Sequence, residues 1–208
     1  MLISALFILV AYLLGSVPFG YLFTKYATGK NVLELGSMSI GSTNVERVAG
    51  KKFSVLTQVC DMLKGLLPVG LAIVLQKNNI IFLEDYFIYL IALAAILGHD
   101  FSIFLKLKGG KGVNTTLGAS ILLAPIQVLA SVIIFFVVKK FTKYVSVGSI
   151  CLGVSLPITG LFLPIPYCFY YLLTVALLIV IMHIPNISRL IQGNENATAS
   201  QQKKQKNA

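Results

Sequence analysis

Long apolar stretches alternate with short polar segments along most of this chain. The apolar stretches cover residues 2–24, 53–76, 80–98, 113–138, 145–163 and 165–182. Most are long enough for a helix that crosses the ~30 Å hydrocarbon core of a bilayer. Hydrophobic residues make up 57% of the 208 residues and charged residues only 12%, about half the charged share of a soluble domain. The pattern predicts an all-α, polytopic integral membrane bundle.

The stretch 113–138 is long enough to form two short helices. Ala124-Pro125 lies near its middle, and proline removes a backbone donor and disfavours helix at the preceding residue. Two short helices that fold back there return the chain to the side it left. The expected number of transmembrane helices then becomes about seven, some of them short.

Charge fixes the expected orientation of these helices. With the N-terminus outside and seven spans, nearly all of the 17 lysines and arginines lie on the inner side, as the positive-inside rule requires. The apolar N-terminus lacks a preceding basic residue, so we expect it to stay as the first span rather than to be cleaved. The C-terminus and the polar segments then face the cytoplasm.

Residues 1–193 are expected to form a single transmembrane domain. Residues 194–208 form a polar, basic cytoplasmic tail without aromatic residues, which is expected to be disordered. The net charge of +10 suits anionic membrane lipids. It does not indicate nucleic acid, because the cations lie between apolar segments. The three cysteines lack metal-ligand or disulfide spacing and are expected to be small buried hydrophobic residues.

Three polar segments combine small or hydroxyl-bearing residues with basic ones. They are GSMSIGSTNVERVAGKK at 36–52, LKLKGGKGVNTT at 105–116 and HIPNISRLIQGNE at 183–195. If the apolar segments span a bilayer, all three can meet on one face. They would form a cationic, donor-rich pocket at the membrane surface, which suits phosphate groups on lipid-like molecules.

The strongest local pattern is Lys106-Leu107-Lys108-Gly109-Gly110-Lys111-Gly112. Its lysines and glycines are typical of an anion-binding loop that opens a helix, here near Val113. It is not an ATP-binding P-loop, because Leu105 stands where that motif has glycine and Gly112 follows Lys111 in place of Ser or Thr. A simple cytoplasmic anchor would explain the lysines but not the glycines.

Two further polar groups have open interpretations. His183 lies at the inner end of the last span and is followed by Asn186 and Arg189, so it is either a functional residue or a hydrogen-bonded structural one. Asp61 and Lys64 lie three residues apart on the second span. They are either functional intramembrane charges or an ion pair that orients the helix.

Several common sites are absent from the sequence. No His has an Asp five positions later, and there is no G-x-S-x-G, no H-E-x-x-H and no pair of metal-binding carboxylates. The acids near the polar segments, Glu34, Glu46, Asp100 and Glu195, are few and scattered. The sequence therefore predicts chemistry that depends on cations and uses no metal and no cofactor.

Taken together, the polar blocks resemble the bacterial acyl-phosphate:glycerol-3-phosphate acyltransferase family. The similarity runs in family order through GSVPFGYL at 15–22, residues 36–52, DMLKG at 61–65, residues 98–113, KYVSVGS at 143–149 and residues 183–195. It implies a seven-span enzyme of the bacterial inner membrane with a cytoplasmic active site. It further implies transfer of a fatty acyl group from acyl-phosphate to glycerol 3-phosphate, yielding 1-acylglycerol 3-phosphate (lysophosphatidic acid) and inorganic phosphate for phospholipid biosynthesis.

The resemblance also implies which residues act. The expected catalytic residues are Ser37, Arg47, Lys111, His183 and Asn186. The expected substrate- and phosphate-binding residues are Gly36, Ser39, Thr43, Asn44, Lys108, Gly109, Gly110, Gly112 and Ser146. Two positions depart from the family pattern. The family usually has Gly-Ser-x-Asn in the first motif, whereas here Met38-Ser39 follows Gly36-Ser37. In the last motif, Ile184-Pro185 stands where polar or basic residues are common.

On this reading, Arg47 and Lys111 hold phosphate, Ser37 positions a substrate, and His183 with Asn186 orients glycerol phosphate. The attacking hydroxyl gives its proton either to His183 or to the departing phosphate, which is slightly preferred because carboxylates are scarce. Two alternatives carry less weight. A phosphate transporter would need polar groups on the outer side as well, and a polyprenyl-phosphate transferase would favour an Asp-rich metal motif.

Overall fold

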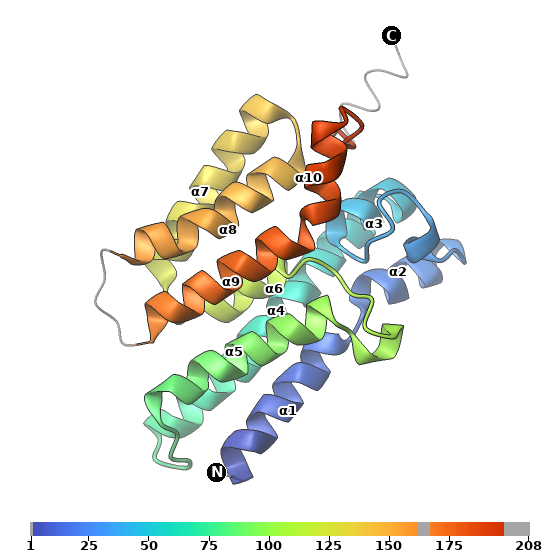
Figure 1. Ribbon diagram of the computed structural model, residues 1–208. Helices are drawn as coiled ribbons and strands as arrows, with labels where there is room; N and C mark the ends of the chain where they lie inside the picture. The colour runs from blue at the N-terminus through green and yellow to red at the C-terminus, as the bar shows by residue number, and fades with distance from the viewer. Residues whose placement is uncertain (1, 162–166, 198–208) are drawn as a thin grey trace.

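The computed structural model describes residues 2–161 and 167–197. Within these ranges the regular structure is helical (Figure 1). The α-helices are α1 (Leu2–Ser16), α2 (Phe19–Thr28), α3 (Ser42–Ala49), α4 (Lys51–Lys77), α5 (Asp85–Asp100), α6 (Val113–Ser120), α7 (Pro125–Thr142), α8 (Val145–Gly160), α9 (Cys168–Met182) and α10 (Ile184–Ile191). Two 3-10 turns, η1 (Val32–Glu34) and η2 (Ile103–Leu105), lie on the N-terminal side of the first two polar segments.

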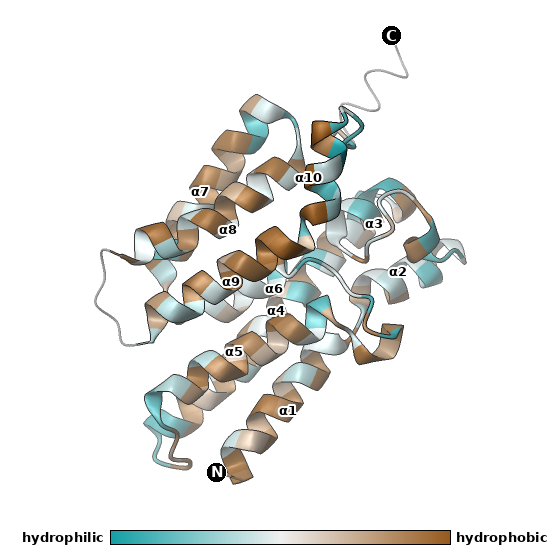
Figure 2. Cartoon of the chain, in the orientation of Figure 1, coloured by the Kyte–Doolittle hydropathy of each residue, from teal (hydrophilic) through white to brown (hydrophobic). Residues whose placement is uncertain are grey.

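The long helices run side by side, and α2, α3 and α10 gather at one end of the bundle (Figure 1). Apolar residues dominate the long helices, while hydrophilic residues collect in the connections and in these end helices (Figure 2). Many large apolar side chains are exposed on the outer surface, as expected where lipid is the solvent. The prediction of an all-α integral membrane bundle is confirmed.

The described helices differ in how well they suit a membrane span. Four stretches are long and apolar enough to cross: Leu2–Thr28, Lys51–Lys77, Asp85–Leu105 and Pro125–Thr142. The pair α9 and α10, bent by 51°, counts as a fifth, and α8 is a shorter apolar helix. The seven predicted spans correspond to α1 and α4–α9, with α6 as a very short one. The number of full crossings stays a prediction.

The predicted break near Pro125 is confirmed. Helix α6 ends at Ser120, and α7 begins at Pro125, where proline's missing N–H costs little because it occupies the first helical turn. Lys111, before α6, and Lys139, near the end of α7, line the same pocket. The chain therefore returns to the end of the bundle from which it left.

The first apolar stretch differs from the expectation of one span over 2–24. Helix α1 stops at Ser16, and α2 starts anew at Phe19 after Pro18. Proline cannot donate its backbone N–H and restricts Val17 to extended conformations. The break releases the Val17 carbonyl, which accepts a hydrogen bond from Lys64 Nζ at 3.0 Å.

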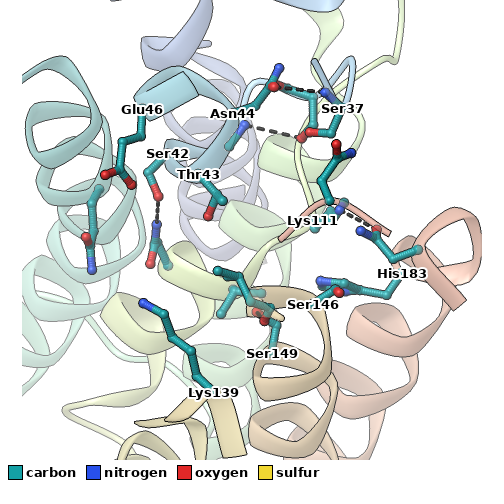
Figure 3. Close-up of a pocket in the computed structure, with 18 of the residues that line it drawn as sticks. Ser37, Ser42, Thr43, Asn44, Glu46, Lys111, Lys139, Ser146, Ser149 and His183 are labelled. Atoms are coloured by element: carbon teal, nitrogen blue, oxygen red, sulfur yellow. Dashed lines mark hydrogen bonds between the residues drawn. The ribbon is translucent and has the colours of Figure 1, made fainter. Parts of the chain in front are cut away.

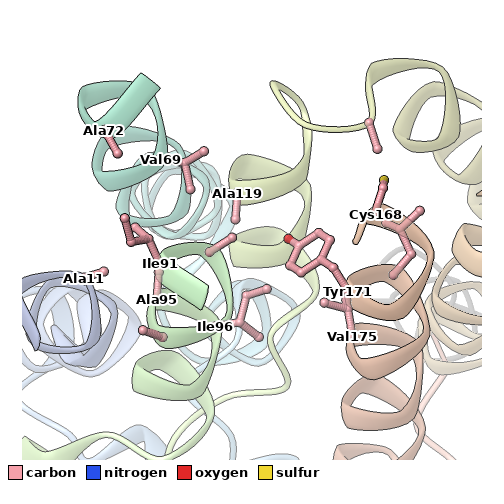
Figure 4. Packing of buried hydrophobic residues seen from close by; sticks show 14 of the residues in the cluster. Ala11, Val69, Ala72, Ile91, Ala95, Ile96, Ala119, Cys168, Tyr171 and Val175 are labelled. Atoms are coloured by element: carbon pink, nitrogen blue, oxygen red, sulfur yellow. The ribbon is translucent and has the colours of Figure 1, made fainter. Parts of the chain in front are cut away.

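Small residues let the helices approach closely (Figure 4). Ala11 of α1 and Ala95 of α5 are fully buried in the main core. A Cβ atom added to Gly118 of α6 would lie 1.9 Å from the backbone oxygen of Met62 in α4. Such close backbone contact is typical of packing between membrane helices. It holds the eight-residue α6 against α4 and thereby fixes where the loop before α6 lies.

Candidate active site

A cavity of about 640 Å³ opens where the three polar segments meet (Figure 3). Residues of all three segments line it, together with the ends of α4, α7 and α8. The structure brings the following predicted site residues to its wall: Ser37, Ser39, Thr43, Asn44, Arg47, Lys111, Ser146, His183 and Asn186. The predicted residues Gly36, Lys108, Gly109, Gly110 and Gly112 do not line it.

Asn44 organises the first polar segment. Its Oδ1 accepts from the Ser37 backbone N–H at 2.9 Å, and its Nδ2 lies at 2.9 Å from the carbonyls of both Leu35 and Ser39. The side chain is buried and its amide is engaged by these bonds. Asn44 thereby fixes the loop that presents Ser37, and its predicted role in binding substrate stays a prediction. Gly36 supports the same loop, because at φ +58° a Cβ atom would lie 2.2 Å from Asn44 Oδ1.

The second segment opens α6 as predicted, with Gly112 at φ +68° directly before Val113. Lys111 reaches the cavity, but the glycines around it pack elsewhere. Gly109 and Gly110 lie against His99 of α5, and Gly112 lies against Asp100. The glycines therefore serve close packing on α5, and Lys108 is exposed. These four residues do not line the cavity wall, and their expected role in binding phosphate stays a prediction.

The third segment surrounds a carboxylate that the sequence-based interpretation did not assign to the site. Glu195 accepts hydrogen bonds from Asn186 Nδ2 at 2.7 Å, Ser146 Oγ at 2.9 Å and Arg189 Nε at 2.9 Å. Asn186 Oδ1 in turn accepts from Lys111 Nζ. One acidic residue thus ties α8, α10 and the Lys111 loop together. The sequence offered one indication of this role, because Glu195 is the last residue of the third polar segment, 183–195.

The beginning of the expected tail also lies at the site. Arg47 Nη2 approaches the backbone oxygens of Asn196 and Ala197 at 3.5 and 3.3 Å. Glu195, Asn196 and Ala197 therefore lie at the cavity wall. The remainder of the expected tail, 198–208, lies outside the described residues.

Positive charge dominates this part of the cavity. Burial lowers the pKa of Lys111 to about 8; Glu195 opposes this shift, while Arg189 and Arg47 add to it. Burial likewise lowers the pKa of Arg47. Burial alone would raise the pKa of Glu195, but its hydrogen bonds from Asn186, Ser146 and Arg189 outweigh this and keep the pKa below its usual value. Three cations, Lys111, Arg47 and Arg189, face two carboxylates, Glu195 and Glu46. They leave an excess of positive charge that an anionic ligand can neutralise.

His183 is held neutral with one ring nitrogen free to accept a hydrogen bond. Its Nδ1 lies 2.8 Å from the Ile179 carbonyl oxygen, which can only accept, so Nδ1 carries the proton. Nε2 then bears a lone pair. Burial, with a further contribution from Lys111, lowers the pKa of His183 to about 4. The imidazole is therefore uncharged near neutral pH.

A second group of cations lines another side of the cavity. Lys139, Lys140 and Lys143 come from the last turn of α7 and the residue after it, next to Phe135 and Phe136. The Lys139 ammonium lies 5.6 Å from the centre of the Phe135 ring. The sequence indicated these lysines only as cytoplasmic anchors. Their place in the cavity depends on how α7 folds back, which local pattern does not reveal.

No group of three or more His, Cys, Asp or Glu side chains within residues 2–161 and 167–197 is placed to hold a metal ion. Besides the carboxylates of Glu46, Asp61 and Glu195, the cavity offers hydroxyls, amides, cationic side chains and the imidazoles of His99 and His183. These can bind phosphate and stabilise negative charge that develops during a reaction.

Comparison with known proteins points to one family. The sequence profile described as Glycerol-3-phosphate acyltransferase matches residues 5–193. The chain is 44% identical to the glycerol-3-phosphate acyltransferase of Clostridium acetobutylicum, over 94% of this chain and 100% of the relative. It is 40% identical to that of Syntrophotalea carbinolica, over 91% and 94% of the two chains.

Two similar crystal structures are of PlsY (YgiH), an integral membrane glycerol 3-phosphate acyltransferase. The glycerol 3-phosphate form superposes with a TM-score of 0.86 at 32% identity, over 96% of this chain and 97% of that chain. The lysophosphatidic acid form gives a TM-score of 0.80, also at 32% identity, over 93% and 94%. With sequence, fold and cavity in agreement, the chain belongs to the glycerol-3-phosphate acyltransferase family of integral membrane enzymes.

Proposed function

We propose that this glycerol-3-phosphate acyltransferase takes its acyl group from acyl-phosphate. The products are 1-acylglycerol 3-phosphate (lysophosphatidic acid) and inorganic phosphate, and the acyl chain enters phospholipid synthesis. The main support is one cavity that holds two groups of cations. The acceptor and product also match the forms in which the similar crystal structures are described.

The two groups of cations suit two phosphate-bearing substrates. Arg47 and Lys111, next to Ser37, His183 and Asn186, would hold glycerol 3-phosphate. Lys139, Lys140 and Lys143 would attract the phosphate of acyl-phosphate. Helix α7 carries these lysines and exposes large apolar residues such as Phe136 and Val137. An acyl chain could therefore lie along α7 in the lipid while its headgroup enters the cavity.

The reaction needs few protein groups. The glycerol hydroxyl oxygen attacks the acyl carbonyl carbon, the bond between that carbon and the phosphate oxygen breaks, and phosphate leaves. Cationic side chains stabilise the charge on the carbonyl oxygen and on the leaving group. Because acyl-phosphate is already activated, placing both substrates together supplies much of the rate without a covalent enzyme intermediate.

The departing phosphate is the better proton acceptor. The pKa of His183 is about 4, whereas the second pKa of a phosphate ester is about 6. His183 Nε2 can accept a hydrogen bond from the glycerol hydroxyl and orient it, and the proton then passes to phosphate. Asn186 would assist in this orientation.

The protein is an integral multi-pass membrane protein, and we infer that the cavity faces the cytoplasm of a bacterial inner membrane. The end of the bundle that holds the cavity carries Lys139, Lys140 and Lys143. The start of α6 and the end of α7 also lie there. Lys77 lies at the far end of α4. This asymmetry supports an outside N-terminus and a cytoplasmic C-terminus. Residues 1–193 would form the membrane domain and 194–208 its tail, whose first residues contact the site.

Purified protein given acyl-phosphate and glycerol 3-phosphate is expected to release one phosphate for each 1-acylglycerol 3-phosphate formed. The measurement follows both products by phosphate assay and mass spectrometry. Acyl-CoA and acyl carrier protein thioesters serve as alternative donors, and omission of glycerol 3-phosphate controls for hydrolysis. Acylation from the thioesters alone would contradict the proposed donor. Uptake of unmodified glycerol 3-phosphate into vesicles would instead support a transporter.

A further inference from the structure

We propose that His99, held by Asp61 and Lys64, is a positioning residue that seats the loop carrying Lys111. These three side chains take no part in the reaction derived above, although Asp61 and His99 border the same cavity. The inference rests on the proposed function, because its main readout is acyl transfer. It adds a structural reason for the polar residues buried in α4 and α5.

The three side chains form a buried chain of contacts. Asp61 Oδ1 lies 3.0 Å from Lys64 Nζ and 3.6 Å from His99 Nδ1, and the second is a close contact longer than a hydrogen bond. Asp61, His99 and Lys64 expose only 1%, 3% and 4% of their surface. Charged groups at this depth are costly unless they are paired, and ionisable residues inside membrane segments are functional candidates by default. The pairing explains how they are tolerated, and the position of His99 suggests what they do.

Three bonds anchor this cluster to neighbouring helices. Lys64 Nζ donates to the Val17 carbonyl at 3.0 Å, where α1 breaks before α2. Just beyond α5, Ser102 Oγ donates to the Ser16 carbonyl at 2.6 Å, and Tyr12 Oη donates to the Phe101 carbonyl at 2.8 Å. The last turn of α5, which carries His99, is therefore tied to both α1 and α4.

The Lys111 loop lies directly on this turn. The Gly110 N–H donates to the His99 carbonyl at 3.0 Å. A Cβ atom on Gly110 would lie 1.9 Å from His99 Nε2, so the loop backbone lies against the Nε2 edge of the imidazole. A Cβ atom on Gly109 would instead lie 2.0 Å from the His99 backbone oxygen. The loop thus has one contact with the ring and a separate one with the backbone.

The position of this loop on α5 determines where the Lys111 ammonium can reach. Lys111 follows Gly110 immediately, and its Nζ bonds to Asn186 across the cavity. A shift of the loop by about 1 Å is enough to lower a rate by roughly 100-fold when the displaced group binds a reacting substrate. On this proposal His99 acts through the position of Lys111.

The two glycines allow a sharp test by a double-mutant cycle. Gly110→Ala should lower kcat/KM for glycerol 3-phosphate by about tenfold or more, chiefly by raising KM. In a His99→Ala background, the same substitution should cost less than about twofold, because the ring it would strike is gone. Gly109→Ala is the matched control: it strikes the backbone carbonyl, so its cost should be the same in both backgrounds.

Conservative variants separate positioning from folding. His99→Asn keeps a donor near the position of Nδ1 and should retain more activity than His99→Leu at similar thermal stability. Asp61→Asn should resemble His99→Leu, whereas Asp85→Asn, at the opposite end of α5, should behave as wild type. Equal cost of Gly110→Ala with and without the ring would overturn the inference, as would wild-type kinetics for His99→Leu.

The proposed function and this inference can fail separately. If the wild-type protein does not use acyl-phosphate, the proposed donor is wrong. The affinity of each variant for glycerol 3-phosphate is then measured by calorimetry, and the double-mutant cycle is calculated from these affinities. Coupling between Gly110 and His99 in that binding would still support the positioning role. Additive binding losses would contradict it.

Discussion

Lys111→Met is expected to lower kcat/KM for glycerol 3-phosphate by roughly 100- to 1000-fold, the usual effect of removing a preorganised charge from a catalytic site. Lys111 is half-buried in the cavity wall and bonded to Asn186, so methionine keeps most of its volume but not its charge. Loss of this cation leaves Arg47 and Arg189 to balance both Glu195 and the incoming phosphate. Initial rates over a range of glycerol 3-phosphate concentrations measure the effect.

The pH profile provides a second check on Lys111. Its pKa of about 8 lies below the ordinary value, and only the protonated form attracts phosphate. In the wild type, kcat/KM should therefore fall as the pH rises through about 8. Bound phosphate favours the charged form, so kcat should fall only at higher pH. Lys77→Met, at the far end of α4, is the matched control. Activity of Lys111→Met within threefold of wild type would contradict its role.

Gly118→Ala is expected to destabilise the fold severely. The added methyl group would lie 1.9 Å from the backbone oxygen of Met62, and backbone cannot move aside as a side chain can. Overpacking costs about 1–3 kcal/mol, occasionally more, and a rigid contact belongs at the upper end. For a chain of this size that corresponds to roughly 10 °C in Tm. Thermal unfolding of the purified protein in detergent measures the shift.

Gly70→Ala is the control for Gly118→Ala. Gly70 lies in α4 near the same interface, but its added methyl group would meet only the Leu122 side chain at 3.4 Å, an ordinary contact. Alanine also favours helix over glycine by about 1 kcal/mol. The control should therefore be neutral or slightly stabilising. Equal Tm values for the two variants would show that α4 and α6 are not packed as described.

The main helices could be predicted because their signals are local. An apolar stretch must find lipid or protein around it, and Pro125 marks the break between α6 and α7, although Pro68 and Pro157 lie inside the continuous helices α4 and α8. The same rule applied to Pro18 would have divided the first apolar stretch. The sequence predicted that the polar segments meet at one end of the bundle, because the positive-inside rule places many basic residues on the same side at once.

The individual roles of the polar residues depended on contacts that the sequence does not display. Asn44 was expected to bind substrate, yet its amide is occupied by its own loop. The glycines near Lys111 indicated an anion-binding loop, whereas their neighbours are the backbone and ring of His99. Glu195 joined the site through bonds to Asn186 and Ser146. These pairings span distant parts of the chain, so no local spacing encodes them.

Two-substrate kinetics tests most directly whether both phosphate-bearing substrates occupy this one cavity together. Initial rates are measured while acyl-phosphate and glycerol 3-phosphate are varied against each other. Direct transfer within a ternary complex predicts that the double-reciprocal lines intersect. Parallel lines would show that phosphate leaves before glycerol 3-phosphate binds, through an acylated enzyme, and would contradict the account.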